Sequence, residues 1–391
     1  MDTLTGTMPR QDNDINLDDL VNVVAQGAGQ DLAHAETLPP AAYTSQAFFD
    51  LEVEKVFKPG WVCVGHVSQI PNVGDYFSID LFNEMLLVVR GKDDAVRVMS
   101  RICTHRWAPL TNGCGNAKLF SCPFHKWGFD LSGNLLGAPL MDQVEFETSK
   151  HNLPRFATEV VDGFIFTNLS NDAEPLAPQI KEFSEQLKKF ALGDLVMAGG
   201  IEYECQFNWK IMAETFMECY HHIGAHEKTF EIQFPARLSY IEEGSSAWTY
   251  GVVPAKSTVP TEEIQLGLHP LTDDLSELES RSFFLYLVYP QHLLAVWADR
   301  VYWFRSQPVG PDKTLLQTYL LVHPEAKNQP DYDAILKQEM GFMDMFNKED
   351  ITVNTMQQRG AETPSALPGR LSHLEKAIWQ LADYIREKTA K

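Results

Sequence analysis

The sequence predicts an α+β protein with two domains, a small all-β domain followed by a larger domain with an antiparallel sheet and a few long helices. Residues 61–166 contain short runs of valine, isoleucine, leucine and phenylalanine separated by glycine, asparagine, aspartate and proline, which is typical of an all-β domain. Residues 201–391 mix strand-like runs with long helical segments, which indicates an α+β domain. A chain of 391 residues also exceeds the usual size of one core.

The elements follow in order along the chain. We predict a loose N-terminal arm over residues 1–45 with a short helix in LDDLVNVVAQ, the all-β domain over 46–170, and the larger domain over 171–391. A helix is expected from AAYTSQ to Gly60, and another in PQIKEFSEQLKKFAL. In the larger domain we expect helices near 211–225, 331–358 and 369–389, and strands in AWTYGVVP, SFFLYLVYP, HLLAVWA, VYWFRSQPV and TLLQTYLLVH.

The composition excludes several classes of function. The formal net charge of -21 leaves no basic surplus to displace the counterions of nucleic acid, so no nucleic-acid partner is expected. The acidic N-terminus does not resemble a signal peptide, and charged residues interrupt the apolar stretch 282–304, so we predict a strand pair there and no membrane span. Six cysteines in a chain of this length do not form a disulfide framework, which favours a reducing cytoplasmic location.

Two short cysteine–histidine motifs occur close together in the first domain. Cys103 and His105 form C-x-H, and Cys122 and His125 form C-x-x-H further along. Two thiols and two imidazoles suit one tetrahedral zinc, and they equally suit a [2Fe–2S] cluster with two thiolates on one iron and two imidazoles on the other. The spacing by itself leaves both metals open. Cys114 fits neither pair, so we interpret it as a loop cysteine.

The residues that flank these motifs resemble a Rieske [2Fe–2S] domain over about residues 61–153. Arg106 follows the first histidine, Pro123 lies inside the second pair, and Trp127 precedes GFDLSGNLLG. Neutral imidazoles in place of two thiolates raise the potential of such a cluster, so that it accepts electrons from a reductase and passes them on. The resemblance implies that the cluster is held by Cys103, His105, Cys122 and His125.

Two departures narrow the class of Rieske protein. The Rieske proteins of respiratory complexes carry an additional cysteine in each loop, whereas Ala108 and Phe124 stand at those places here, so no disulfide is expected. This pattern resembles the oxygenase and ferredoxin branch. Trp107 and Lys126 stand where glycine is usual in the oxygenase loops. We expect them to change the loop surface and the docking of the electron donor without affecting ligation.

A second group of candidate ligands lies in NWKIMAETFMECYHHIGAH, residues 208–226. Glu218, His221 and His226 form E-x-x-H-x-x-x-x-H, and two histidines with one carboxylate make the facial triad of non-haem Fe(II) oxygenases. Residues five apart on a regular helix are separated by about 140°. His221 and His226 therefore reach one metal only if the helix is bulged or ends between them, which Gly224 would permit.

This segment resembles the mononuclear-iron segment of Rieske non-haem iron oxygenases, in the terminal oxygenase (alpha) subunit, and so implies a helix-grip (START-like) catalytic domain. It implies that His221 and His226 bind iron. In that family the acidic residue three places before the first histidine is no ligand but bridges a cluster histidine of one subunit to an iron histidine of its neighbour. Glu218 takes that place, and i,i+3 spacing on a helix makes a hydrogen bond to His221 natural. Thr215 replaces an asparagine of many relatives, and His222 is expected to point away from the metal.

The family places the third iron ligand on a late helix, and KEDITVNTMQQRG followed by LPGRLSHLEKAIWQL matches that layout. The resemblance implies Asp350 as the ligand, with Asp344 as the alternative. Glu349 and Lys348 are interpreted as part of a solvated helix face.

The sequence lacks a G-x-G-x-x-G motif after a strand and a C-x4-C-x2-C motif, so no nicotinamide, flavin or plant-type cluster site is predicted. Electrons must then come from a separate NAD(P)H-dependent reductase, with or without a ferredoxin. The resemblance further implies O₂ as a substrate and a homotrimer in which electrons cross between subunits through Glu218.

The substrate is the part that the sequence predicts least directly. Aromatic residues crowd the stretch 283–304, namely Phe283, Phe284, Tyr286, Tyr289, Trp297, Tyr302, Trp303 and Phe304. Such rings can cage a quaternary ammonium, stack on an aromatic substrate or fill the core. The ECYH and QQRG segments look most like choline, glycine-betaine and carnitine monooxygenases, which implies hydroxylation or oxidative N-demethylation of a small substrate such as a quaternary ammonium compound. The alternatives are a ring-hydroxylating oxygenase of an aromatic acid or other aromatic compound, and a Rieske electron carrier without oxygenase activity.

Overall fold

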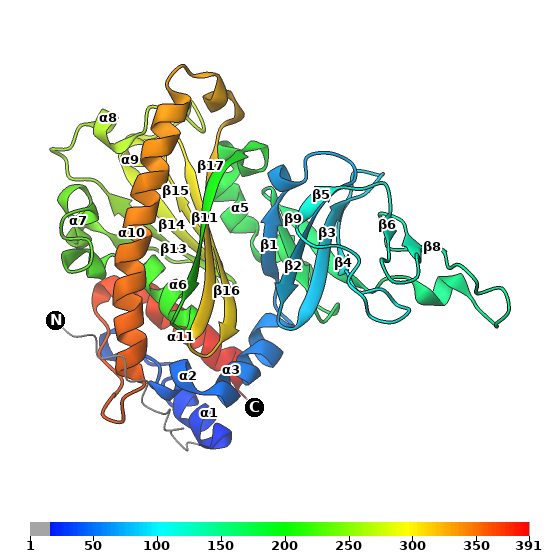
Figure 1. Cartoon of the computed structure of the whole chain (residues 1–391). Helices are drawn as coiled ribbons and strands as arrows, with labels where there is room; N and C mark the ends of the chain where they lie inside the picture. The colour runs from blue at the N-terminus through cyan, green and yellow to red at the C-terminus, as the bar shows by residue number, and fades with distance from the viewer. Residues whose placement is uncertain (1–15, 391) are drawn as a thin grey trace, which may run out of the picture.

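The computed structural model describes residues 16–390, in which two seven-stranded antiparallel sheets, one from each domain, pack against each other (Figure 1). The sheet of the first domain has the order β1-β10-β9-β4-β3-β2-β5. Its strands are β1 (Val62–His66), β2 (Asp75–Leu81), β3 (Glu84–Arg90), β4 (Val96–Ser100), β5 (Cys114–Asn116), β9 (Arg155–Val161) and β10 (Phe164–Asn168). The first domain is thus all-β, as predicted.

A three-stranded sheet extends the first domain on the side far from the sheet of the larger domain (called the catalytic sheet below), where Figure 1 places β6 and β8. It contains β6 (Phe120–Ser121), β7 (Gly128–Phe129) and β8 (Leu135–Gly137). Its buried residues include Trp127 and Phe129, which pack in one cluster with Cys103 and Cys122. This small core therefore brings the two cysteine–histidine loops together.

The larger domain is built on the second sheet, with the order β11-β17-β16-β15-β14-β13-β12. The strands are β11 (Val196–Cys205), β12 (Tyr240–Ile241), β13 (Trp248–Pro254), β14 (Ser282–Val288), β15 (His292–Val296), β16 (Val301–Gly310) and β17 (Lys313–Val322). The segment 282–304 forms strands as predicted, but it contains three in place of a pair, since β14, β15 and the start of β16 are consecutive neighbours there.

The alternation of side chains along β14 gives this sheet two apolar faces. Phe283 and Leu285 belong to the core that includes Met343 and Phe346, whereas Phe284 and Tyr286 pack with the opposite core. That second core contains Phe164 of the first domain, so one face of the catalytic sheet covers the Rieske-like sheet and the other receives the long helices.

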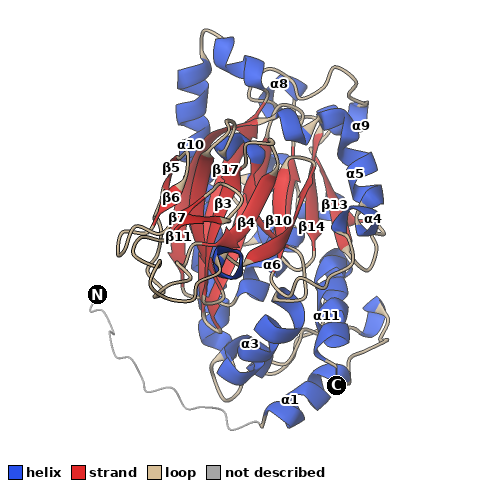
Figure 2. Cartoon of the chain, turned by 90° about the vertical axis from the view of Figure 1, so that its right-hand side faces the viewer, coloured by secondary structure: helices blue, strands red, loops and turns tan. Residues whose placement is uncertain are grey.

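The helices gather mainly at one end and on one face of the catalytic sheet (Figures 1 and 2). They are α1 (Leu17–Ala25), α2 (Ala41–Thr44), α3 (Gln46–Glu52), α4 (Leu176–Gln179), α5 (Lys181–Leu187), α6 (Trp209–Met217), α7 (Phe230–Gln233), α8 (Thr261–Ile264), α9 (Glu277–Ser280), α10 (Tyr332–Ala361) and α11 (Lys376–Thr389). Figure 1 shows α10 running the length of the sheet. Among these described residues, none of the helices combines the length and hydropathy that crossing a membrane requires.

The N-terminal arm differs from the prediction. Residues 1–15 lie outside the described part of the chain. The short helix predicted in LDDLVNVVAQ is present as α1, but the arm is packed, with Leu20 fully buried in the core of the larger domain. Beyond the arm, α3 buries Phe48 in the same core. The helix predicted from 41 to 60 is interrupted at Ser45, whose hydroxyl caps α3, and it ends in a π-helical turn. The arm is therefore no loose extension. The domain limits at residues 45 and 170 remain predictions.

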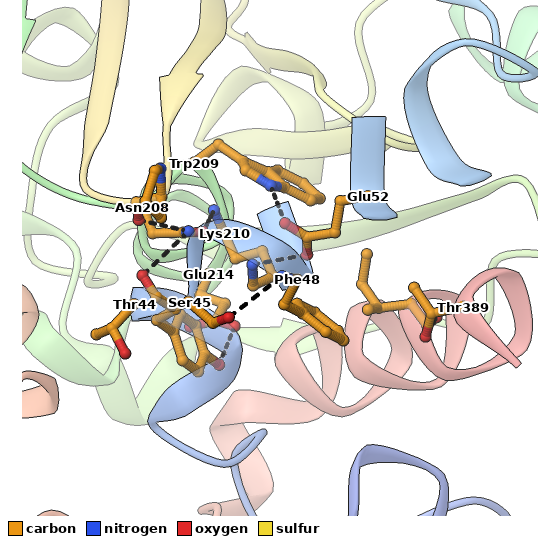
Figure 3. A network of polar contacts seen from close by, with 12 residues as sticks. Thr44, Ser45, Phe48, Glu52, Asn208, Trp209, Lys210, Glu214 and Thr389 are labelled. Carbon is orange, nitrogen blue, oxygen red and sulfur yellow. Dashed lines mark hydrogen bonds and ion pairs between the residues drawn. The ribbon is translucent and has the colours of Figure 1, made fainter. Parts of the chain in front are cut away.

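A buried polar network joins this arm to α6 (Figure 3). The ammonium of Lys210 lies 2.7 Å from Glu52 Oε1, the Trp209 indole donates to Glu52 Oε2 at 3.1 Å, and Tyr43 donates to Glu214 at 2.7 Å. Lys210 and Glu52 are wholly inaccessible to solvent. Burial raises the pKa of Glu214 to about 7. Removal of Lys210 would thus leave Glu52 buried without its charged partner.

We expect Lys210→Met to destabilise the protein by about 3 kcal/mol, because it leaves Glu52 buried without its charged partner. The double variant Glu52→Gln/Lys210→Met removes both charges and should recover part of that loss. Urea denaturation of the two variants and the parent protein tests this. Equal midpoints for parent and single variant would show that the ion pair does not hold the arm.

Candidate metal centres

The two cysteine–histidine loops have the same backbone hydrogen-bond pattern. The Cys103 amide donates to the Ala108 carbonyl at 2.9 Å, and the Cys103 carbonyl accepts from Trp107 at 3.0 Å. In the second loop the Cys122 amide donates to Trp127 at 2.8 Å, and its carbonyl accepts from Lys126 at 3.0 Å. Each cysteine is therefore fixed at the start of a tight loop that returns over it.

The side chains of these loops converge with unsatisfied donor atoms. Cys103 and Cys122 are buried, and the rings of His105 and His125 lie 4.7 Å apart. The Nδ1 atoms of both histidines are buried without a hydrogen-bond partner. Such atoms are costly unless a ligand meets them. Two thiols and two bare imidazole nitrogens thus fit a cluster held by both loops, while Cys114 lies exposed in β5.

Both loops turn through a left-handed residue that is not glycine. Trp107 has φ 62° and Lys126 has φ 61°, at equivalent points of the two loops. The conformation explains why glycine suits these positions, since a Cβ there meets the following carbonyl. The substituted side chains point outward, and Trp107 is 79% exposed. The loops thus tolerate strain at two points where the sequence departs from its relatives.

We predict that Trp107→Gly is about 1 kcal/mol more stable than Trp107→Ala, because only glycine relieves the left-handed strain. Both variants remove the same exposed ring, so their difference isolates the backbone. Arg106, the preceding residue, has no positive φ. At that position the alanine variant should be more stable than the glycine variant. Denaturation midpoints measure both comparisons, and equal effects at the two positions would contradict the strain.

The candidate iron ligands follow α6 and do not lie on it. The helix predicted over 211–225 ends at Met217, and His221 lies in a separate 3₁₀ turn, Tyr220–Ile223. Gly224 follows this turn with φ -111°, so the left-handed freedom of glycine is not used. The predicted break therefore occurs before both histidines, and the chain between them is irregular.

Two carboxylates fix the tautomers of the histidines. Glu218 Oε1 lies 2.8 Å from His221 Nδ1, and Glu218 Oε2 also accepts from the backbone of His221 at 2.9 Å. Glu349 lies 2.6 Å from His226 Nδ1 and accepts from Thr229 at 2.9 Å. Because a carboxylate only accepts, each Nδ1 carries the hydrogen. Both Nε2 atoms are therefore left free to bind a proton or a metal ion.

The third oxygen comes from α10. Asp350 Oδ1 lies 2.9 Å from His226 Nε2 and 3.5 Å from His221 Nε2, and it is buried without a hydrogen-bond partner. The ligand atoms of the three residues all lie within 4.8 Å of one another. Two imidazole nitrogens and a carboxylate oxygen that converge in this way gather around a shared proton or a bound cation. This set fits the two-histidine, one-carboxylate geometry of non-haem iron.

The charges around the histidines agree with a cation site. Burial alone would lower the pKa of His221, but Glu218 and Asp350 raise it to about 10. Burial would raise the pKa of Asp350, but the two histidines hold it well below its usual range. A bound divalent ion would replace the proton that these groups otherwise attract.

The alternative ligand, Asp344, is placed elsewhere. It accepts from Tyr203 at 2.9 Å and pairs with Lys348 at 2.6 Å, on the far side of α10. The interpretation of Glu349 as a solvated residue is wrong, because it binds the imidazole of His226. The position of Glu349 directly before Asp350 could have indicated this contact. Adjacent helix residues point about 100° apart, so the two carboxylates can reach the two nitrogens of the His226 ring. The exposed Lys348 agrees with its interpretation.

A cavity of about 60 Å³ opens beside the three ligand atoms. Its walls are mainly aromatic and include Phe283, Trp297, Tyr302 and Phe304 from the predicted aromatic stretch. The other aromatic residues of that stretch lie elsewhere, as Tyr286 and Trp303 do in the opposite core. His222 also lines the cavity, although Nδ1 donates to the Phe234 carbonyl at 3.0 Å, so it lies closer to the metal site than predicted.

Thr215 reaches the same cavity from α6 and is bound to an amide that the sequence did not indicate. Its hydroxyl donates to Asn354 Oδ1 at 2.7 Å, and Asn354 is buried with its Nδ2 unpartnered. The asparagine missing at Thr215 thus has a counterpart on α10, one turn after Asp350.

We expect Glu349→Ala to weaken metal binding at the mononuclear centre about 10–100-fold, because His226 loses the carboxylate that orients it. Asp344→Ala, on the same helix, should leave the affinity unchanged. Competition of the purified variants with a calibrated chelator measures the affinity without any assay of activity. Weaker binding by the Asp344 variant would instead point to that residue as the ligand.

A pair of cluster-type loops in one domain and a two-histidine, one-carboxylate centre in the next are the parts of a Rieske-type oxygenase. Residues 60–156 match the family model of the Rieske [2Fe-2S] domain, and residues 192–391 match that of the ring hydroxylating alpha subunit (catalytic domain). The chain belongs to the Rieske non-haem iron oxygenases. Both matches together imply a Rieske [2Fe–2S] cluster and a mononuclear iron as its cofactors, and the predicted fold is confirmed.

Several known proteins are similar to this chain. The carnitine monooxygenase oxygenase subunit of Acinetobacter pittii is 35% identical over 196 residues, which span 49% of this chain and 53% of that protein. The chain thus matches about half the length of that relative. The glycine betaine monooxygenase oxygenase subunit of Chromohalobacter salexigens is 26% identical over 365 residues, or 86% of this chain and 82% of that protein.

Solved structures share the whole fold. The quaternary ammonium Rieske monooxygenase of gut microbiota that oxidises carnitine has a TM-score of 0.80 at 25% identity, covering 92% of this chain and 97% of that one. Naphthalene 1,2-dioxygenase from Rhodococcus sp. has a TM-score of 0.79 at 20% identity, covering 95% and 98%, and this likeness concerns the fold alone.

Proposed function

We propose that the protein is the terminal oxygenase component of a multicomponent system that hydroxylates or oxidatively N-demethylates a small substrate such as a quaternary ammonium compound. The observation that carries this proposal is the convergence of two histidine nitrogens and one carboxylate oxygen at the wall of an aromatic cavity. The likeness to carnitine and glycine betaine monooxygenases supports the substrate class.

The proposed roles divide between the two centres. Iron at the second centre would supply the activation of O₂ with electrons that arrive from the cluster. The chain's own residues do the rest. Glu218 and Glu349 hold the hydrogens of the ligating imidazoles at Nδ1, and the aromatic walls exclude water from the reacting substrate. We assign the cluster to Cys103, His105, Cys122 and His125, and the iron to His221, His226 and Asp350.

The partners belong to the same proposal. Electrons come from a separate NAD(P)H-dependent reductase, with or without a ferredoxin, and the chain works as a cytoplasmic homotrimer. Two exposed apolar areas support assembly, one at the cluster loops with Trp107 and Phe124 and one beside the iron segment with Tyr220 and Ile223. The mass of the purified protein in solution, measured by light scattering, tests the trimer.

Oxygen uptake with a surrogate reductase, corrected for uncoupled reduction, tests the function. Quaternary ammonium compounds should stimulate uptake and release product, whereas aromatic acids should not. Turnover with aromatic acids alone would overturn the proposal. An electron carrier without oxygenase activity would contain about two irons per chain, where the oxygenase needs about three.

Hydroxylation of an aromatic compound is the second candidate. The aromatic lining of the cavity favours it, because flat rings stack on such walls as readily as a cation binds to them. Neutral aromatic compounds in the same uptake assay distinguish the two candidates by their products.

We predict that Glu218→Ala, loaded at a saturating concentration of iron, retains both the cluster and the iron but loses turnover, because the bridge between subunits is removed while the ligands remain. Iron content and the spectrum of the cluster establish retention. Stopped-flow oxidation of the reduced cluster in the presence of substrate and O₂ should slow by about 10–100-fold. A variant that keeps the parent rate would eliminate the bridge.

A further inference from the structure

The cavity beside the iron site has walls of unusual charge. Among the described residues that line it, none is a lysine or an arginine. Two of the lining residues, Glu218 and Asp350, carry a carboxylate. Its neutral polar groups are few, and the Thr215 hydroxyl is already bound to Asn354. A negatively charged group inside this cavity would therefore meet no side chain that neutralises it.

Arg300, which lies against Trp297 of the cavity wall, is already paired with other side chains. The guanidinium of Arg300 lies 4.1 Å from the centre of the Trp297 ring, and it lines a separate hollow together with Glu339. Asp299 at 2.7 Å and Glu339 at 3.0 Å balance its charge. Phe283 stacks on Trp297 at 4.5 Å, so the indole lies in a fixed stack. Arg300 is thus held in place by its own partners.

A bound divalent ion does not reverse this balance. Asp350 would hold such an ion together with the two imidazoles, and Glu218 and Glu349 add a negative charge behind each imidazole. Three carboxylates around one divalent ion leave no positive excess for an anionic substrate. A carboxylate in a poorly hydrated site costs several kcal/mol unless it is paired.

The size of the cavity matches a compact head group. By volume, about 60 Å³ accepts about four water-sized groups. A trimethylammonium head has this bulk, and aromatic walls attract a cation most strongly where water is excluded. Tyr302 and Phe304 supply such walls from β16, and Phe346 adds one from α10.

We propose, on the basis of the oxygenase function above, that this cavity binds the cationic head of a quaternary ammonium substrate that carries no carboxylate. An amino alcohol of the choline type fits this description. Carnitine and glycine betaine each carry a carboxylate, so this chain would differ in substrate from the relatives that are named for them.

Three ligands of nearly equal shape test the charge rule. Choline, glycine betaine and 3,3-dimethyl-1-butanol differ in the carboxylate and in the positive charge, and calorimetric titration of the iron-loaded, cluster-containing protein gives their affinities. Choline should bind about tenfold or more tightly than either of the other two, because an unpaired carboxylate and a lost cation–π contact each cost about that much. Equal or tighter binding of glycine betaine, equal binding of the butanol, or no binding of choline at millimolar concentrations would overturn the proposal.

A matched pair of variants connects the effect to the cavity. Phe304→Leu keeps apolar bulk but removes a ring from the wall. It should weaken the binding of choline more than the binding of the butanol. Phe284→Leu removes a ring from the opposite face of the same sheet and should change neither. Thermal melting verifies that both variants fold.

Failure of this inference and failure of the proposed function are distinguishable. If choline binds as expected but drives no product formation with O₂ and a reductase, the charge rule stands and the oxygenase proposal fails. If glycine betaine binds well and is turned over, the oxygenase proposal stands and the charge rule fails.

Discussion

The convergence of two histidine nitrogens and one carboxylate oxygen on one point is the constraint on which the rest of this structure depends. His221 and His226 come from an irregular segment after α6, and Asp350 comes from a helix far along the chain. The two histidines lie far from Asp350 in the chain, so the scaffold must bring them together. The buried Lys210 network fixes α6 against the arm, and α10 packs along the catalytic sheet. The carboxylates of Glu218 and Glu349 then set the orientation of each ring.

The sequence predicted much of the fold because its patterns were local. The strands of the catalytic sheet, the two late helices and the all-β first domain follow from alternation and helical periodicity, which tertiary packing did not override. The arm was wrongly predicted to be loose, because its short helices become stable only by burying residues such as Leu20 in a core that forms from distant residues. The break in the helix predicted over 211–225 was expected from the spacing of the histidines, but its place was not.

The candidate site was predictable where residue types are specific and not where partners are distant. Cysteine and histidine spacing pointed to the ligands, whereas Glu349 looked like any acidic residue on an exposed helix. Its role depends on an imidazole more than a hundred positions away in the chain. Asn354 is similar, because only the packing of α10 on α6 brings it to Thr215. Which aromatic residues line the cavity likewise depends on the two faces of the sheet, and alternation along β14 separates Phe283 from Phe284.

The helix α10 also fixes the spacing between several contacts of the site. Glu349 and Asp350 meet the iron segment, Asn354 meets Thr215, and Gln358 accepts from the backbone of Asn208 at the start of α6. One inserted residue between Asp350 and Gln358 would turn everything beyond it by about 100° and shift it by about 1.5 Å. Loops elsewhere on the surface can absorb an inserted residue, but this helical stretch cannot do so without losing its contacts. The length of the chain between these contacts is therefore as strict a requirement of the site as the identity of its ligands.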